Sequence, residues 1–403
     1  MSITIITASA GTGKTTRLSQ VLDDAIASGT VRPEAIIATT FTRHAAAELV
    51  ERARSRLLAS GHGREAHQLL AARIGTVNSV CGSFVTDFAF ELGLSPALRV
   101  LDEGAAELEL QRALATVVSS TLSDELFGFQ QRFDRQLDWR LEVRRMIEAA
   151  RSNAIDADGL RVCAARSTAG VDRCLGPVTD DGDDGAALDA QLLAAVDAAL
   201  GAIDLERDPT KVTHAYVELL RDAHLALGDS RLRWGDWAKL CKAGPGKKSE
   251  AHAGAVQAAA SRHLEHPRLR REMHRLTELL FAVAADGLVA YQAHKRGRGL
   301  IDFVDQEALA LGLLRRPDVR EALAGQIDLV LVDEFQDTSP LQLAIFLELA
   351  SLATQAVWVG DQKQAIYGFR GTDPALMDAM IESLTATTTD PDLVSAGSVP
   401  RNP

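Results

Sequence analysis

A glycine-rich turn between a strand and a helix places the strongest constraint on the fold of this chain. The segment TASAGTGKTT (residues 7–16) follows a short β-rich run and opens a helical pattern. Gly11 and Gly13 allow the backbone to turn so that its N–H groups face an anion, and the helix N-terminus adds a favourable dipole. Lys14 can reach the outer phosphates of a nucleotide, and Thr15 can bind Mg²⁺. The predicted nucleotide-binding residues are Ala8, Ser9, Ala10, Gly11, Thr12, Gly13, Lys14, Thr15 and Thr16.

A second motif lies in the last third of the chain, where an apolar run enters a cluster of carboxylates. The segment LVLVDEFQDTSPLQ (residues 329–342) places Asp333, Glu334 and Asp337 directly after four apolar residues. Neighbouring carboxylates disfavour each other's ionised form, so the cluster needs a positive partner. Taken alone, the segment would be interpreted as a solvated acidic strand end.

The phosphate-binding loop supplies that partner. If both strands belong to one sheet, Asp333 can bind the Mg²⁺ ion that Thr15 also binds. Glu334 is then placed to orient and deprotonate an attacking water molecule. The two segments together predict a site for a magnesium–nucleotide complex, in which Lys14 and Asp333 meet although they lie far apart in the chain.

The order of strand and helix patterns predicts an α/β fold. Strand patterns at residues 2–7 and 35–40 are each followed by helical patterns, which is typical of a parallel sheet covered by helices. Strand patterns return at residues 327–332 and 356–360. Between them, Ser339 as N-cap, followed by Pro340 and, at the third position, Gln342, marks the start of a helix.

A long helical insertion divides the predicted sheet in two. Residues 102–299 are rich in Ala and Leu with a helical period, and strand patterns are nearly absent there. We interpret Trp234 and Trp237, which lie in this insertion, as core residues. The predicted organisation is a first α/β part at 1–101, a helical insertion at 102–299, a second α/β part at 300–385 and a tail at 386–403.

Composition restricts the cellular setting more than the function. Apolar residues make up 46% and charged residues 24% of the chain, as in an ordinary globular protein. No apolar run approaches the roughly 20 residues that a membrane helix needs, and the N-terminus lacks the pattern of a secretory signal. The net charge of −12 argues only weakly against a nucleic-acid partner, because phosphate binding depends on a local groove. The cysteines form no CxxC pair, which favours reduced thiols and a cytoplasmic protein: Cys81, Cys163, Cys174 and Cys241.

Several motifs resemble those of superfamily 1 DNA helicases of the UvrD/Rep/RecB type. DEFQDT (333–338) is nearly identical to the second motif of that family, and VGDQKQAIYGFRGTDP (359–374) is similar to the third. TFTRHAAAEL (40–49) and GTVNSVCGSF (75–84) resemble two further segments, as does LIDFVDQEALAL (300–311). The YGFRG form and ASAGTGKT are most similar to the RecB-like branch.

The resemblance implies a RecA-like P-loop NTPase domain with ATP and Mg²⁺ as cofactors and with Lys14 and Glu334 in catalysis. It implies that Gln364 contacts the γ-phosphate and the attacking water. His44 stands where the family usually has Lys, and Asn78 where it usually has His. The residues implied in DNA binding are Thr40, Phe41, Thr76, Tyr367, Phe369 and Arg370.

The resemblance further implies movement in the 3′→5′ direction along single-stranded DNA, or at a junction of duplex and single strand. Family members carry a second RecA-like domain, and nothing after residue 373 matches it, so we expect a partner chain or a further segment to supply it. The alternative is an ATP-responsive DNA- or protein-binding subunit without unwinding activity. A P-loop kinase or GTPase would not need the 333–338 and 359–374 motifs together.

Overall fold

A computed structural model of the chain describes residues 3–7, 14–95, 98–133, 137–176, 184–229, 231–360 and 382. The chain divides into two compact units. The first unit consists of Met1–Glu109, Ala149–Ile155 and Ala293–Pro403, and the second of Leu110–Glu148 and Asp156–Gln292. The first unit holds the sheet and the second is helical, as expected for an α/β domain with an insertion.

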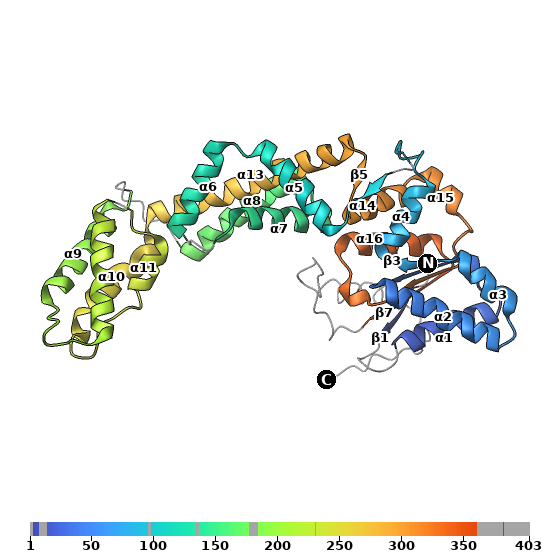
Figure 1. Cartoon of the computed structure of the whole chain (residues 1–403), viewed down its shortest axis with the longest axis horizontal. Helices are drawn as coiled ribbons and strands as arrows, with labels where there is room; N and C mark the ends of the chain where they lie inside the picture. Colours follow the sequence, from blue (N-terminus) through green and yellow to red (C-terminus); the bar gives the residue numbers. More distant parts are fainter. Residues whose placement is uncertain are drawn as a thin grey trace. The chain divides into compact units, whose positions relative to one another are not determined.

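The first unit is built on a five-stranded sheet in which every neighbouring pair of strands is parallel (Figure 1). The strand order is β1-β7-β6-β2-β3, so the two C-terminal strands, β7 and β6, lie between the N-terminal strands β1 and β2. A separate parallel pair, β4 and β5, lies where the chain leaves and re-enters this unit. The strands are β1 (Ile3–Thr7), β2 (Ile36–Thr40), β3 (Arg73–Thr76), β4 (Arg99–Val100), β5 (Leu300–Ile301), β6 (Leu329–Val332) and β7 (Gln355–Gly360).

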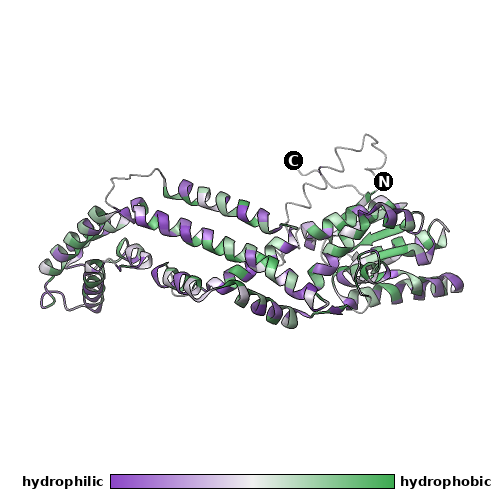
Figure 2. Ribbon diagram, turned by 90° about the horizontal axis from the view of Figure 1, so that it is seen from above, coloured by the Kyte–Doolittle hydropathy of each residue, from purple (hydrophilic) through white to green (hydrophobic). Residues whose placement is uncertain are grey.

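The three inner strands are apolar on both faces, which is what a parallel sheet between two helical layers requires. Successive residues of a strand point to opposite faces. Ile37, Val330 and Trp358 therefore belong to one core cluster, and Ile36 and Leu331 to the other. Figure 2 shows these strands as the most continuously hydrophobic part of the unit.

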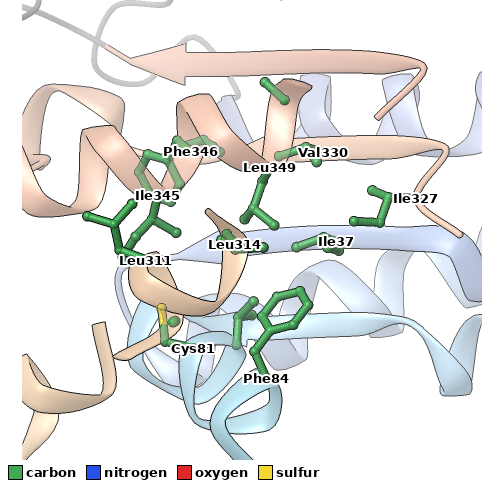
Figure 3. Packing of buried hydrophobic residues seen from close by; sticks show 14 of the residues in the cluster. Ile37, Cys81, Phe84, Leu311, Leu314, Ile327, Val330, Ile345, Phe346 and Leu349 are labelled. Atoms are coloured by element: carbon green, nitrogen blue, oxygen red, sulfur yellow. The ribbon is translucent and has the colours of Figure 1, made fainter. Parts of the chain in front are cut away.

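Helices cover both faces of the sheet. Helices α1 and α2 supply Leu22, Leu49 and Leu57 to the cluster on one face. Helices α4, α14 and α16 cover the other face, where the side chains in Figure 3 interdigitate with Ile37 and Val330. The helices of this unit are α1 (Lys14–Ala27), η1 (Pro33–Ala35), α2 (Arg43–Ala59), α3 (Gly63–Gln68), η2 (Leu69–Ala71), α4 (Val77–Asp87), α14 (Phe303–Leu314), α15 (Pro317–Leu323), η5 (Phe335–Asp337) and α16 (Pro340–Leu352).

Side-chain caps start the helices that follow the strands. Ser339 caps α16, with Pro340 at its first position and Gln342 closing a capping box, as predicted. Asp302 and Asp305 form a second capping box at the start of α14. Thr42 and Thr76 accept hydrogen bonds from the first turns of α2 and α4. Each cap satisfies N–H groups that a helix leaves unpaired, so the strand-to-helix turns are locally determined.

The second unit is a set of helices with its own core. Trp234 and Trp237 are buried in that core, as expected, together with Tyr216, Leu220 and Val256. Its helices are α6 (Ser120–Phe133), α8 (Ala157–Leu175), α9 (Ala186–Ala202), α10 (Lys211–Gly228), α11 (Trp234–Leu240), η3 (Glu250–His252), α12 (Gly254–Ser261) and η4 (Arg262–Glu265). Helices α5 (Glu103–Val117), α7 (Trp139–Ser152) and α13 (Pro267–Gly297) have residues in both units.

Helix α13 is long and apolar enough, by length and composition alone, to cross a membrane. Within the second unit, however, its Val283 and Leu288 are buried in protein. A side-chain carbon at Gly287 would lie 2.5 Å from Leu114 of α5 and 3.2 Å from Ile147 of α7, so α13 packs closely against both helices. We therefore assign the part of α13 up to Gln292 to the helical unit, where Val283 and Leu288 contribute to its core.

Candidate nucleotide site

The ends of the parallel strands bring the predicted motifs to one edge of the sheet. In the strand register, Thr7 lies opposite Gly360, Thr40 opposite Thr76, and Thr39 opposite Val332. Ligands of open α/β sheets bind at this carboxyl edge. The phosphate-loop segment, the acidic segment and the three other motif segments that follow β2, β3 and β7 all begin there.

The distance between the first two motifs follows from the strand order. β7 lies between β1 and β6, so the ends of β1 and β6 are two strand spacings apart, or about 10 Å. The triphosphate chain of a nucleotide with its Mg²⁺ ion is of similar size. Helix α1 begins at Lys14, so the helix start that the sequence predicts is present.

Part of the predicted site lies outside the described residues. This holds for residues 8–13, for the side chains of Lys14, Thr15 and Thr16, and for Gln364. It also holds for the predicted DNA contacts Tyr367, Phe369 and Arg370.

A tight turn follows β6 and carries both candidate catalytic carboxylates. We call residues 333–337 the acidic turn. The N–H of Asp333 donates to the carbonyl of Thr39 at 2.9 Å, which extends the pairing of β6 with β2 by one residue. The next residue, Glu334, adopts a left-handed backbone with φ 53° and ψ 44°. This conformation is uncommon for a residue other than glycine and is found preferentially at functional sites.

Hydrogen bonds orient the two carboxylates. The N–H of Glu334 donates to Oδ1 of Asp333 at 3.0 Å, and Nε2 of Gln336 donates to Oε2 of Glu334 at 2.5 Å. Asp333 and Glu334 are both half-buried, whereas Phe335, Gln336 and Asp337 are buried. The turn therefore presents two partly accessible carboxylates, while its remaining residues are packed into the protein.

The donor set of this edge fits Mg²⁺. Magnesium is usually held by one or two carboxylates, while water and substrate phosphates complete its shell. Within the described part of the chain, no group of three His, Cys, Asp or Glu side chains could hold a metal ion by itself. One carboxylate from Asp333, a hydroxyl from Thr15 and the phosphates of a nucleotide would together form a magnesium site that the protein and its substrate share.

The described candidates for DNA contact differ in accessibility. Phe41 is 36% exposed directly after β2, and Thr76 is half-buried at the start of α4. The side chain of Thr40 is buried, and its hydroxyl donates to the carbonyl of Thr42 at 2.9 Å. Thr40 thus supports the turn into α2 and does not present its side chain at the surface.

The two residues that depart from the family pattern lie in the same region. His44 is exposed in the first turn of α2. Oδ1 of Asn78, in the first turn of α4, is buried and has no hydrogen-bond partner among the described residues. A side-chain carbon at Gly75 would lie 2.2 Å from Oγ of Ser79, so a larger residue there would require the Ser79 hydroxyl to move.

A network of four charges on the first unit, two of them buried and two half-buried, was not predicted from the sequence. Lys295, at the end of α13, donates to Asp302 at 2.8 Å and to Asp305 at 2.5 Å. Arg151, at the end of α7, donates to the same carboxylates at 2.5 and 3.0 Å. Burial lowers the pKa of the Lys295 ammonium, and nearby Arg151 lowers it further, whereas the two carboxylates raise it.

A second buried group, Glu307, lies one turn further along α14 and is 5% exposed. Burial raises its pKa to about 7. The only sequence signal for these groups was the Asp302-x-x-Asp305 spacing of a capping box before an apolar run.

Comparison with known proteins finds similarity to one group of proteins, the helicases. The family model of the UvrD/REP helicase N-terminal domain matches residues 1–385. An ATP-dependent helicase/nuclease subunit of Anoxybacillus flavithermus is 26% identical over 93% of this chain and 36% of its own length. The protein of the same name from Geobacillus kaustophilus is 28% identical over 95% of this chain and 35% of its own length. The chain thus spans about a third of the length of these curated relatives.

Proposed function

Because the chain belongs to the family of UvrD/REP helicase N-terminal domains, we propose that it is the ATP-binding motor part of a DNA helicase. One observation carries this proposal. In the five-stranded parallel sheet, the end of β1, where the phosphate-loop segment begins, and the acidic turn after β6 lie at one edge, with β7 between the two strands. This arrangement supports a single magnesium–nucleotide site that Lys14, Thr15 and Asp333 share.

The residues of the site would divide the work as follows. The backbone of residues 8–16 and the ammonium of Lys14 would bind the phosphates. Asp333 and Thr15 would hold Mg²⁺, which would offset the negative charge of the phosphates. Glu334 would take a proton from the attacking water, and the hydrogen bond from Gln336 would orient its carboxylate. Gln364 would contact the γ-phosphate and the same water molecule.

The same edge of the sheet would bind DNA. The exposed ring of Phe41 and the half-buried Thr76 lie directly after β2 and at the end of β3. Aromatic faces stack on bases without regard to sequence, which suits a protein that moves along a single strand. We propose that Tyr367, Phe369 and Arg370 complete this surface, and that movement along the strand is 3′→5′. Thr40 would contribute through its backbone, since its side chain is buried.

The complete machine would include more than these residues. The curated relatives are named as helicase/nuclease subunits, and this chain matches about a third of their length. We propose that a second RecA-like domain, from a further segment or a partner chain, closes over the nucleotide and supplies cations to the transition state. The protein would act in the cytoplasm on single-stranded DNA or on a junction with duplex.

The substitution Glu334→Gln tests the proposal. This variant should bind ATP with the affinity of the unmodified protein, while DNA-stimulated ATP hydrolysis falls at least about 100-fold, because the general base is removed. The matched control is Glu321→Gln, an exposed residue of α15, which should hydrolyse ATP at the unmodified rate. Equal hydrolysis by the Glu334→Gln variant would exclude Glu334 as the base, and absence of ATP binding by the unmodified protein would contradict the function itself.

A further inference from the structure

Glu307 makes a hydrogen bond that connects α14 to the helix that follows the acidic turn. Its carboxylate lies in the packed layer between α4, α14 and α16 and is 5% exposed. Oε1 of Glu307 accepts a hydrogen bond from Nε2 of Gln342 at 2.7 Å. A buried carboxylate is costly without such a donor. Cys81 of α4, Leu311 of α14 and Ile345 of α16, which Figure 3 labels, belong to one apolar cluster in this layer.

Gln342 relays this contact to the acidic turn. Its Oε1 accepts the N–H of Ser339 at 3.3 Å, and its own N–H donates to Oγ of Ser339 at 3.2 Å. Ser339 comes two residues after the last residue of the acidic turn. One amide side chain therefore holds the start of α16 with its oxygen and holds Glu307 with its nitrogen.

The charged groups near Glu307 form ion pairs with one another. The charged groups that act on Glu307 are Arg151 and Asp302, and both belong to the four-charge network with Lys295 and Asp305. Cys81 lies on α4, and burial followed by the charge of Glu307 raises the pKa of its thiol. Among the described residues, the Gln342 amide is the hydrogen-bond donor to Glu307 that the structure shows.

We propose that Glu307 is a positioning residue for nucleotide hydrolysis, which acts through Gln342 and Ser339 to hold Asp333 and Glu334 in orientation. The inference rests on the proposed function. The physical reason is the strain in the turn: Glu334 adopts a left-handed backbone that the surrounding structure must hold in place. The Phe335–Trp358 stack holds the turn from the side of β7, and the Glu307–Gln342 pair holds it from the side of α16.

An exchange of the two side chains tests this role. Gln342→Glu places two carboxylates at hydrogen-bond distance, and their repulsion should break the contact when both are ionised. Glu307→Gln alone keeps an acceptor oxygen and should be mild. The double variant Glu307→Gln with Gln342→Glu restores a donor and an acceptor, and a Glu at this position of a capping box still accepts the N–H of Ser339.

The readouts separate positioning from folding. We expect Gln342→Glu to lower kcat of DNA-stimulated ATP hydrolysis by about 10-fold to 100-fold at pH 8.5, the range that a misplacement of about 1 Å produces. Affinity for nucleotide without Mg²⁺ should not change. At pH 6 the two carboxylates can share a proton, so the defect should shrink, and the double variant should recover kcat at both pH values.

Controls and contrary outcomes are distinct. Gln355→Glu makes the same chemical change at an exposed position of β7 and should leave kcat unchanged. Unmodified kcat in Gln342→Glu, or a loss that neither pH 6 nor the double variant reverses, would overturn the positioning role. If Gln342→Glu fails to fold, recovery of fold but not of kcat in the double variant would also overturn it. Absence of nucleotide binding by the unmodified protein would instead refute the proposed function.

Discussion

The ring of Phe335 stacks on the indole of Trp358, with 4.8 Å between the ring centroids and 27° between the ring planes. Phe335 belongs to the acidic turn after β6, and Trp358 belongs to the neighbouring strand β7. Both side chains are buried. The turn that carries Asp333 and Glu334 is therefore fixed to β7, the strand that lies between β6 and β1. A shift of β7 would move the acidic turn as well.

Replacing Lys14 by Ala should weaken ATP binding by about 10-fold to 100-fold, because a charge-assisted hydrogen bond to phosphate contributes about 1.5–3 kcal/mol. Binding of a fluorescent ATP analogue to the purified chain measures this change. Unchanged affinity would count against the phosphate-loop assignment of residues 8–16.

Replacing Phe41 by Ala should weaken binding of single-stranded DNA, because base stacking contributes about 1–3 kcal/mol per base. Fluorescence anisotropy with a labelled oligonucleotide at fixed salt measures the affinity. Phe90→Ala is the matched control, since Phe90 is 81% exposed after α4 and belongs to none of the motif segments. Equal losses in both variants would show that Phe41 has no specific role.

Replacing Lys295 by Met should destabilise the first unit by about 3–5 kcal/mol, because it leaves the buried carboxylate of Asp302 and the half-buried carboxylate of Asp305 with one cation. Calorimetry of the purified chain measures the loss. Lys239→Met is the control: this lysine pairs with Asp236 at 3.2 Å but is 64% exposed, so its loss should change stability by less than about 1 kcal/mol. If the losses of stability in the two variants differ by less than about 1 kcal/mol, the network has no structural role.

Replacing Glu307 by Gln should change how stability depends on pH. The pKa of Glu307 is raised from 4.5 to about 7, so the folded protein binds a proton more tightly than the unfolded chain. The contribution of Glu307 to the stability of the unmodified protein therefore falls as the pH rises from about 4.5 to 7. Above pH 7 this contribution no longer changes with pH.

The Gln variant lacks this titration, so its stability relative to the unmodified protein should rise by up to about 3 kcal/mol between pH 4.5 and pH 8. Calorimetry at the two pH values gives the comparison. A difference between the proteins that does not vary with pH would show that Glu307 titrates normally.

Local signals in the sequence predicted the elements that local chemistry determines. The strands expected at residues 2–7, 35–40, 327–332 and 356–360 are present as β1, β2, β6 and β7, within two residues at each end. The start of α16 was predicted from Ser339, Pro340 and Gln342, and all three have the expected roles. Capping and apolar runs act over a few residues, so the sequence displays them directly.

Features that depend on distant residues were not predicted. Strand β3 is short and half-buried, so it has no apolar run to mark it. The four-charge network joins residues from three segments of the chain, and Arg151 reaches Asp302 across 151 positions. The left-handed backbone of Glu334 follows from tertiary packing that overrides the local preference of a glutamate.

The strand order has a consequence for biosynthesis. Strands β1 and β2 leave the ribosome early, yet the two strands that separate them in the sheet, β7 and β6, are translated only after residue 328. The helical unit, complete at Gln292, can therefore fold before β6 and β7, the strands that lie between β1 and β2, have been synthesised. A nascent chain arrested between Gln292 and Leu329 would expose the apolar edge of β2, which makes this interval the one at which chaperone capture or aggregation should be greatest.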